Sequence, residues 1–130
     1  MKFAITLGAA LLALCTTAAF AADYVGGAIK TSTIEGKEVL TDASGMTLYT
    51  FDKDTAGVTN CYDKCAINWP PLFADANAVA EGDFTLVDRT DGTKMWAYKG
   101  WPLYLWIEDT APGMTTGDGV GGVWHTAIEQ

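Results

Sequence analysis

Histidine and basic side chains are scarce in this sequence. There is one histidine, His125, and 8 lysine and arginine residues stand against 16 aspartate and glutamate residues, a formal net charge of −8. Clustered Lys and Arg bind nucleic acids and anionic membranes, so this balance argues against both as partners. A single histidine also excludes blue-copper and Rieske sites built from one chain, because each needs two histidine ligands.

The signatures of several large enzyme and cofactor classes are also missing. The sequence has no Gly-x-Ser-x-Gly elbow, no Walker loop and no Rossmann fingerprint. It also has no Cys-x-x-Cys-His, which excludes covalent c-type haem. These absences favour a protein that is not an enzyme and has no resident cofactor, with copper or calcium as the alternatives.

Long apolar runs are absent except at the N-terminus. Lys2 precedes an apolar stretch over residues 3–14, and Ala19-Phe20-Ala21 follows as a small-residue cleavage site. This pattern predicts a signal peptide over residues 1–21, with a run too short to span a membrane as a helix. Residues 22–130 would then form a single domain of periplasmic or secreted location, with a net charge of −9 after the loss of Lys2.

The three cysteines divide between this leader and the domain. Cys15 could carry a lipid anchor, but Leu14 precedes it where a small residue is usual, so ordinary cleavage is favoured. Cys61 and Cys65 remain, and in an oxidising compartment we expect them to form a disulfide, worth about 2 kcal/mol in the chain-entropy model. A thiol redox pair or a copper site with His125 and Met114 is the alternative.

One stretch of the chain occurs twice. Residues 45–56 align with residues 100–111 without a gap, and we call the constant spacing between aligned positions the repeat offset. The matched positions are Gly45 with Gly100, Leu48 with Leu103, Tyr49 with Tyr104, Phe51 with Trp106, Asp54 with Asp109 and, further on, Trp69 with Trp124. An echo of this length indicates two copies of one supersecondary unit.

These matched residues carry a family resemblance. The pattern Tyr-x-(Phe/Trp/Tyr)-x-x-Asp occurs at Tyr49 and again at Tyr104, and residues 61–72 follow the first copy with a Cys and Trp-Pro-Pro block. The chain resembles the bacterial secreted-repeat family, the predicted lipoproteins with the Yx(FWY)xxD motif, over residues 36–128. That family has no established activity, so the resemblance implies a fold and an exported location rather than a reaction.

Turn signals and short β-prone runs divide the remaining chain. The runs are residues 38–41, 46–51, 84–88, 94–98, 103–107 and 123–128, and Asp91-Gly92 is a hairpin signal. Residues 22–36 are predicted as a lead-in with at most one edge strand, and residues 74–82 as an Ala-rich connector. We expect an all-β domain, a small antiparallel sheet or barrel-like fold of two related β-meander halves. The repeat units are about 38–72 and 93–128, with a short helical turn within 61–69.

The motif side chains have structural and functional interpretations. Tyr49 and Phe51 are two residues apart and should share one face of a strand, as should Tyr104 and Trp106, which favours core packing over a ligand platform. On that interpretation Trp106→Ala should cost about 3–5 kcal/mol. Asp54 and Asp109 are predicted to accept backbone hydrogen bonds in the loops that follow. Binding of a cation or a substrate by these two aspartates is the alternative.

The sequence also contains two weaker metal patterns. Asp52, Asp54 and Asp63 partly imitate a calcium loop, but Ala56 supplies no ligand at the fifth position. His125 is expected to be a partly exposed strand residue, with metal ligation beside Met114 as the alternative.

The preferred hypothesis is therefore a non-enzymatic module of the periplasm or cell envelope that binds a small ligand or an envelope protein. A redox or copper-handling accessory using Cys61, Cys65 and His125 is the alternative.

Overall fold

The computed structural model describes residues 22–130, so the predicted signal peptide and Cys15 lie outside the described residues. Its strands are antiparallel, and its α-helix is five residues long, so the predicted all-β class is confirmed. The elements are, in order, β1 (Asp23–Tyr24), η2 (Val25–Gly27), β2 (Ile29–Ile34), β3 (Lys37–Asp42), β4 (Tyr49–Phe51), α1 (Lys64–Asn68), β5 (Phe73–Ala74), β6 (Phe84–Asp88), β7 (Lys94–Tyr98), β8 (Trp101–Pro102), η3 (Val120–Gly122) and β9 (Trp124–Thr126). Within residues 22–130, no helix is of a length and apolarity to cross a membrane.

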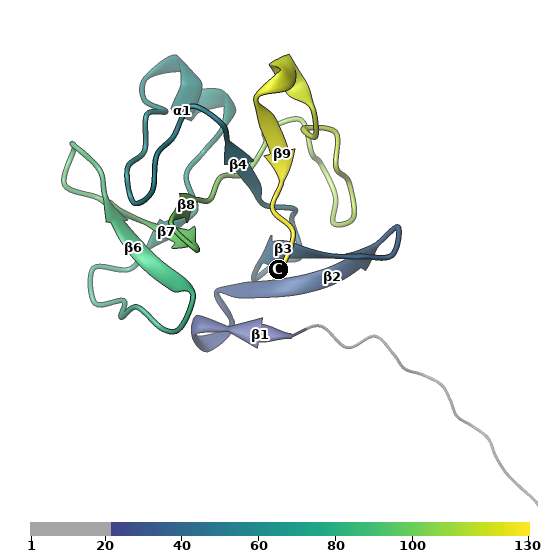
Figure 1. Ribbon diagram of the computed structural model, residues 1–130, viewed down its shortest axis with the longest axis horizontal. Coiled ribbons are helices and arrows are strands. Elements are labelled where there is room, and N and C mark those ends of the chain that lie inside the picture. The colour runs from purple at the N-terminus through teal and green to yellow at the C-terminus, as the bar shows by residue number, and fades with distance from the viewer. Residues whose placement is uncertain (1–21) are drawn as a thin grey trace, which may run out of the picture.

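The strands form three separate sheets (Figure 1). One has the order β1-β2-β3 and another the order β5-β7-β6, with β8 also paired to β7. The third joins β4 to β9, which run side by side in the figure although they are far apart in the sequence. The turn between β2 and β3 is the two-residue Glu35-Gly36, with φ of 51° and 81°. Positive φ at both central residues is what a type I′ hairpin requires.

The two halves are related by an approximate two-fold axis. The repeat offset places Ile29, at the start of β2, on Phe84, at the start of β6, so the two hairpins correspond. At the axis, the backbone N–H of Tyr49 donates to the carbonyl of Tyr104 at 2.8 Å, and the return bond is 3.0 Å. The tyrosines of the two motifs are therefore hydrogen-bonded directly to each other.

The motif segment of each half pairs with the last segment of the other half. In one half Tyr49 of β4 pairs with Thr126 of β9, and in the other Tyr104 pairs with Pro71. Thr126 and Pro71 are themselves equivalent positions under the repeat offset. Because each motif takes its partner from the other copy, neither half is complete alone, as expected for repeats that bury a shared core.

Two sequence predictions differ from this structure. Residues 22–36 were predicted to hold at most an edge strand, yet β2 is the central strand of its sheet. One inward-facing position of β2 is a buried threonine, Thr31, so the strand shows no alternation of apolar and polar residues in the sequence. Residues 103–107 were predicted as a strand, but their hydrogen bonds to residues 68–72 are not reciprocated. For example, the Leu105 N–H donates to the Pro70 carbonyl at 2.8 Å. Pro70 and Pro71 have no N–H to donate back, so no continuous ladder forms.

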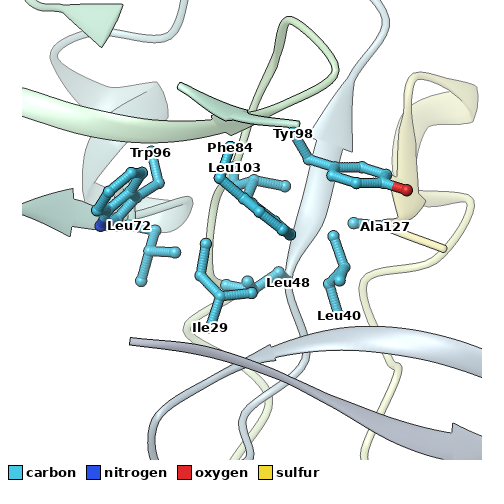
Figure 2. Close-up of a cluster of buried hydrophobic side chains, with 9 residues drawn as sticks. All are labelled: Ile29, Leu40, Leu48, Leu72, Phe84, Trp96, Tyr98, Leu103 and Ala127. Atoms are coloured by element: carbon cyan, nitrogen blue, oxygen red, sulfur yellow. The ribbon is translucent and has the colours of Figure 1, made fainter. Parts of the chain in front are cut away.

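An apolar cluster fills the space between the β2–β3 and β6–β7 hairpins (Figure 2). Six of its nine buried members fall in pairs related by the repeat offset, namely Ile29 with Phe84, Leu48 with Leu103 and Leu72 with Ala127. The cluster contains Ile29, Leu40, Leu48, Leu72, Phe84, Trp96, Tyr98, Leu103 and Ala127. A second cluster, built around the motif residues, occupies the interface between the copies.

Candidate functional site

The tyrosine of each motif is hydrogen-bonded to the aspartate of the other motif. The Tyr49 hydroxyl donates to Oδ2 of Asp109 at 2.5 Å, and the Tyr104 hydroxyl donates to Oδ2 of Asp54 at 2.6 Å. All four side chains are buried. Hydrogen bonds to a charged group are stronger than neutral ones, so these two Tyr–Asp pairs hold the copies together.

The other oxygen of each carboxylate fixes its own loop. Oδ1 of Asp54 accepts the backbone N–H of Asn60 at 2.7 Å, and Oδ1 of Asp109 accepts that of Thr116 at 3.0 Å. The hydroxyl of Thr116 donates to the same oxygen at 2.6 Å. The backbone hydrogen bonds expected for both aspartates are therefore present, and their oxygens are occupied by protein groups.

Two residues that the sequence analysis did not single out complete the network at Tyr104. Thr59 Oγ1 lies 2.5 Å from the Tyr104 hydroxyl, which already donates to Asp54, so the Thr59 hydroxyl is the donor. The buried Arg89 guanidinium donates to Thr59 Oγ1 at 3.4 Å and to the Cys61 carbonyl at 3.1 Å. No motif marks these residues, because their roles depend on contacts between distant segments.

Burial changes the protonation equilibria of this network. Desolvation raises the pKa of Tyr49 and of Tyr104, and the hydrogen bond to the aspartate raises each further. Desolvation also raises the pKa of Asp54, while the hydrogen bonds from Tyr104 and Asn60 and the charge of Arg89 act in the opposite direction. Burial disfavours the charged form of each acid, and this is the dominant cause at all three groups.

Alkaline pH should therefore destabilise this protein. The folded state keeps Tyr49 and Tyr104 neutral, whereas the unfolded chain releases their protons at a pKa of about 10. The stability that they contribute is complete below that pH and is lost as pH rises above it, because the unfolded state then binds fewer protons. Urea unfolding from pH about 8 to about 11 should give a falling free energy of unfolding. Tyr104→Phe is the control and should flatten the slope; an equal slope in both proteins would contradict the assignment.

Four aromatic rings from the two copies stack across the axis. Phe51 stacks on Trp124 at 4.2 Å between ring centroids, Trp124 on Trp69 at 3.8 Å, and Trp69 on Trp106 at 4.0 Å. The interplanar angles are 11°, 3° and 25° in that order. We call these four rings the aromatic stack.

The aromatic stack is mostly enclosed. Trp69 and Trp124 are 5% and 4% exposed, and Phe51 is also buried. Trp106 is only partly buried, because it occupies one end of the stack. The two tyrosines close the sides with edge contacts, Tyr49 against Trp69 at 5.3 Å and Tyr104 against Trp124 at 5.1 Å between centroids. The rings thus pack with one another rather than forming an exposed platform.

Gly117 lies against this stack and was not predicted from the sequence. A Cβ atom there would lie 2.8 Å from Cη2 of Trp69 and 2.9 Å from the Tyr49 ring. The Gly117 N–H donates to the Tyr49 hydroxyl at 3.2 Å. Glycine at this position allows a backbone segment to approach the rings closely, which is one of the uses of that residue.

The candidate metal ligands have other partners. Cys61 and Cys65 are joined by a disulfide with an S–S distance of 2.08 Å, which takes both sulfurs of the proposed copper set. His125 Nε2 lies 2.9 Å from Asp52 Oδ2 on the exposed surface, and the Met114 sulfur accepts the N–H of Thr110 at 3.3 Å.

The proposed calcium set is likewise not gathered into one cluster. Both oxygens of Asp54 accept hydrogen bonds, while Asp52 contacts His125. In the part of the chain from residue 22 onward, no three His, Cys, Asp or Glu side chains are grouped closely enough to hold a metal ion, and Asp63 belongs to no such group.

A hollow of about 400 Å³ is lined by residues outside the two motifs. Half of its lining comes from residues 74–82, which the sequence analysis predicted as a connector. Its walls come from η2, β5, β7 and the segment after β5, and include Phe73, Val79 and Trp96. Asp75 and Glu81 supply two carboxylates, and the described residues that line it include no Lys, Arg or His. We call it the Phe73 hollow.

Comparison with known proteins agrees with the internal repeat. A family model described as a secreted repeat of unknown function matches residues 30–73 and residues 85–128. The second match is displaced from the first by the repeat offset, the same spacing that relates the motifs. Searches of the curated proteins and of the solved structures gave no significant match. Two matches that together span most of the chain show that it belongs to this family of secreted repeats of unknown function.

Proposed function

We propose that this chain is an exported, non-enzymatic binding module, and that the Phe73 hollow takes a small organic cation with an apolar body. The observation that carries the proposal is the pairing, in one hollow, of exposed apolar side chains with carboxylates. Phe73 and Val79 are 55% and 77% exposed, although each is large and apolar. Exposed apolar side chains gathered at a concave surface are typical of an interaction site.

The size and lining of the hollow suit a small molecule. Its volume of about 400 Å³ falls within the usual range for small-molecule sites, which combine apolar walls with a few polar groups. Phe73 is an exposed aromatic residue of this lining, and the buried Trp96 of β7 forms part of one wall. Aromatic faces attract organic cations through the ring quadrupole, which adds to the burial of the apolar body.

The charge of the hollow selects a cation over an anion. Asp75 and Glu81 are the charged residues of the lining, and the whole chain carries a net charge of −8. Glu81 accepts the N–H of Val25 at 3.2 Å and so holds the η2 wall in place. We therefore assign the contact with the cationic group to Asp75.

The motif residues are poorer candidates for ligand binding. The carboxylates and hydroxyls of the two Tyr–Asp pairs are buried and hydrogen-bonded to protein groups. A ligand that used them would have to break contacts between the copies. We assign the motif a structural role and the Phe73 hollow the binding role.

Calorimetric titration with 3-phenylpropylammonium tests this function, against the neutral 3-phenylpropanol and the anionic 4-phenylbutanoate. The cation should bind most tightly, since apolar burial and charge act together. Phe73→Ala should remove most of the binding, and Asp75→Asn should make the cation bind no better than the alcohol. Ile67→Ala, an exposed apolar residue on α1, is the matched control and should bind as the native protein does. Equal binding of anion and cation, or of Phe73→Ala and native protein, would refute the proposal.

The place of action follows from the same proposal. The family is described as secreted, and we infer that the domain works in the periplasm or outside the cell after cleavage following Ala21. A lipid anchor at Cys15 is the alternative. The intact mass of the purified protein distinguishes a chain that starts at Ala22 from one that starts at a lipid-bearing Cys15.

A further inference from the structure

We propose that the three indoles of the aromatic stack and the two Tyr–Asp pairs form a relay for single electrons, which carries an oxidising equivalent from the surface at Trp106 to the buried hydroxyls of Tyr49 and Tyr104. This function is separate from ligand binding in the Phe73 hollow and uses none of the residues assigned to it. Its parts are a solvent-reachable entrance, a continuous row of oxidisable rings, and proton acceptors fixed at its end.

The row of rings is continuous from the surface to the axis. Trp106 is partly exposed, and its ring lies 4.0 Å from that of Trp69, which lies 3.8 Å from that of Trp124. The planes of Trp69 and Trp124 differ by 3°. Indole is among the most easily oxidised side chains, and face-to-face contact gives the orbital overlap that electron transfer between rings needs. The two buried indoles are shielded from solvent, so an electron vacancy on them is protected from reaction with water.

Each buried indole touches one tyrosine. Trp69 contacts Tyr49 at 5.3 Å and Trp124 contacts Tyr104 at 5.1 Å between centroids. Tyr49 is the nearer end point, two steps from Trp106, and Tyr104 is one ring further along. The approximate symmetry thus supplies two end points, at different distances from one entrance.

The aspartates make oxidation of these tyrosines chemically feasible. A phenol that loses an electron becomes strongly acidic, and the loss is favourable only if its proton leaves at the same time. Tyr49 donates to Asp109 at 2.5 Å, and Tyr104 donates to Asp54 at 2.6 Å, so a carboxylate oxygen is already in place to take each proton. No water and no side-chain movement is needed for the transfer.

The electrons and protons of one turnover balance. An outer-sphere one-electron oxidant at the surface takes an electron from Trp106 and is itself reduced. Trp69 then reduces the Trp106 radical cation, and Tyr49 reduces that of Trp69. As Tyr49 loses its electron, its hydroxyl proton moves to Oδ2 of Asp109. The products are the reduced oxidant, a neutral Tyr49 radical and a protonated Asp109. A one-electron reductant reverses each step and restores the starting state.

The polar character of the end points argues for more than packing. Burial of a carboxylate carries a desolvation cost, and apolar residues of similar volume often replace buried charges without loss of stability. The interface nevertheless buries both Asp54 and Asp109, each against a phenol in contact with an indole. The structural role of each pair requires only its hydrogen bonds, whereas tyrosine oxidation requires a phenol that touches an indole and donates to a carboxylate, and both end points have this combination.

Flash photolysis tests the relay in the folded protein. A ruthenium(II) tris-bipyridine sensitiser with a cobalt(III) acceptor supplies the one-electron oxidant, and transient absorption distinguishes tryptophanyl from tyrosyl radicals. In native protein a tryptophanyl signal should convert to a tyrosyl signal. Trp106→Leu, at the accessible end of the stack, should lose most of that tyrosyl signal. Trp101→Leu is the control, because Trp101 is 42% exposed and is not part of the stack. It should give the native tyrosyl yield.

A second pair of variants isolates the proton step. Asp109→Asn and Asp54→Asn keep the side-chain shape but remove the basic oxygen, so together they should prolong the tryptophanyl signal and reduce the tyrosyl yield. Circular dichroism confirms that each protein is folded before its radicals are compared. A native tyrosyl yield in folded Trp106→Leu, or equal losses in Trp106→Leu and Trp101→Leu, would overturn the proposal.

Discussion

Trp69→Ala is expected to lower the free energy of unfolding by about 3–5 kcal/mol, the range for truncating a large buried aromatic side chain. Trp69 makes three aromatic contacts in the interface, since it stacks on Trp106 and Trp124 and takes the edge of Tyr49. Its removal leaves a cavity between the two copies, and each copy depends on contacts with the other for its fold. For a small domain with a total stability of about 5–15 kcal/mol, this loss is large.

The comparison with Trp106→Ala makes this prediction specific. The sequence predicted a cost of about 3–5 kcal/mol for Trp106→Ala, but the structure places that ring at the partly exposed end of the stack. Its truncation should therefore cost less than Trp69→Ala, and Trp101→Ala, outside the stack, should cost least. Urea unfolding of the three variants at one pH gives the order. If Trp106→Ala proved as damaging as Trp69→Ala, the enclosed centre of the stack would not be the main anchor.

The repeat explains why much of this architecture could be predicted. The repeat offset alone pairs Tyr49 with Tyr104 and Asp54 with Asp109, and local turn signals predict the β6–β7 hairpin at its observed bounds. Such features depend on a direct match of residue types or on residues close in the sequence. The short helix α1 could also be predicted from local sequence, because Pro70 limits how far a helix can extend before it.

The exchange between the copies could not be predicted in the same way. A repeat states which residues are equivalent, but not whether Tyr49 bonds to Asp54 of its own copy or to Asp109 of the other. That choice accompanies the pairing of β9 with β4, a contact between segments of the two halves that are far apart in the sequence. A sequence could indicate such an exchange if both halves ended in a recognisable strand. The first half ends at Pro70-Pro71, which does not have the sequence of a strand.

The Phe73 hollow was missed for a related reason. Residues 74–82 lack periodicity and were predicted as a connector, and the other walls of the hollow come from η2 and β7. Trp96 was predicted only as part of a strand. A concave surface made by three separate segments has no linear signature, whereas a duplicated motif does. The motif therefore drew attention to the interface that holds the copies together rather than to the surface assigned here to binding.

Gly117→Ala should be among the most damaging single-methyl changes in this chain. The added Cβ would lie within 3.0 Å of Trp69 and Tyr49. Both rings are held in place by their neighbours, Trp69 by the stack and Tyr49 by its hydrogen bond to Asp109. Overpacking of a tightly filled core typically costs about 1–3 kcal/mol, and displacement of the loop would also break the bond from the Gly117 N–H to Tyr49.

The matched control separates lack of space from backbone strain. Gly36 has φ of 81°, in the left-handed region that disfavours alanine, but a Cβ there would meet no atom within 4 Å. Gly36→Ala should therefore cost only the conformational penalty, about 1–2 kcal/mol, and should leave the near-ultraviolet circular dichroism of the stacked indoles unchanged. The φ of Gly117 lies outside that region, so Gly117→Ala tests space alone. It should change both the unfolding free energy and the indole spectrum. Loss of stability with an unaltered spectrum would mean that the loop, and not the stack, yields to the added methyl group. In that case the contact of Gly117 with Trp69 would not limit the packing of the interface.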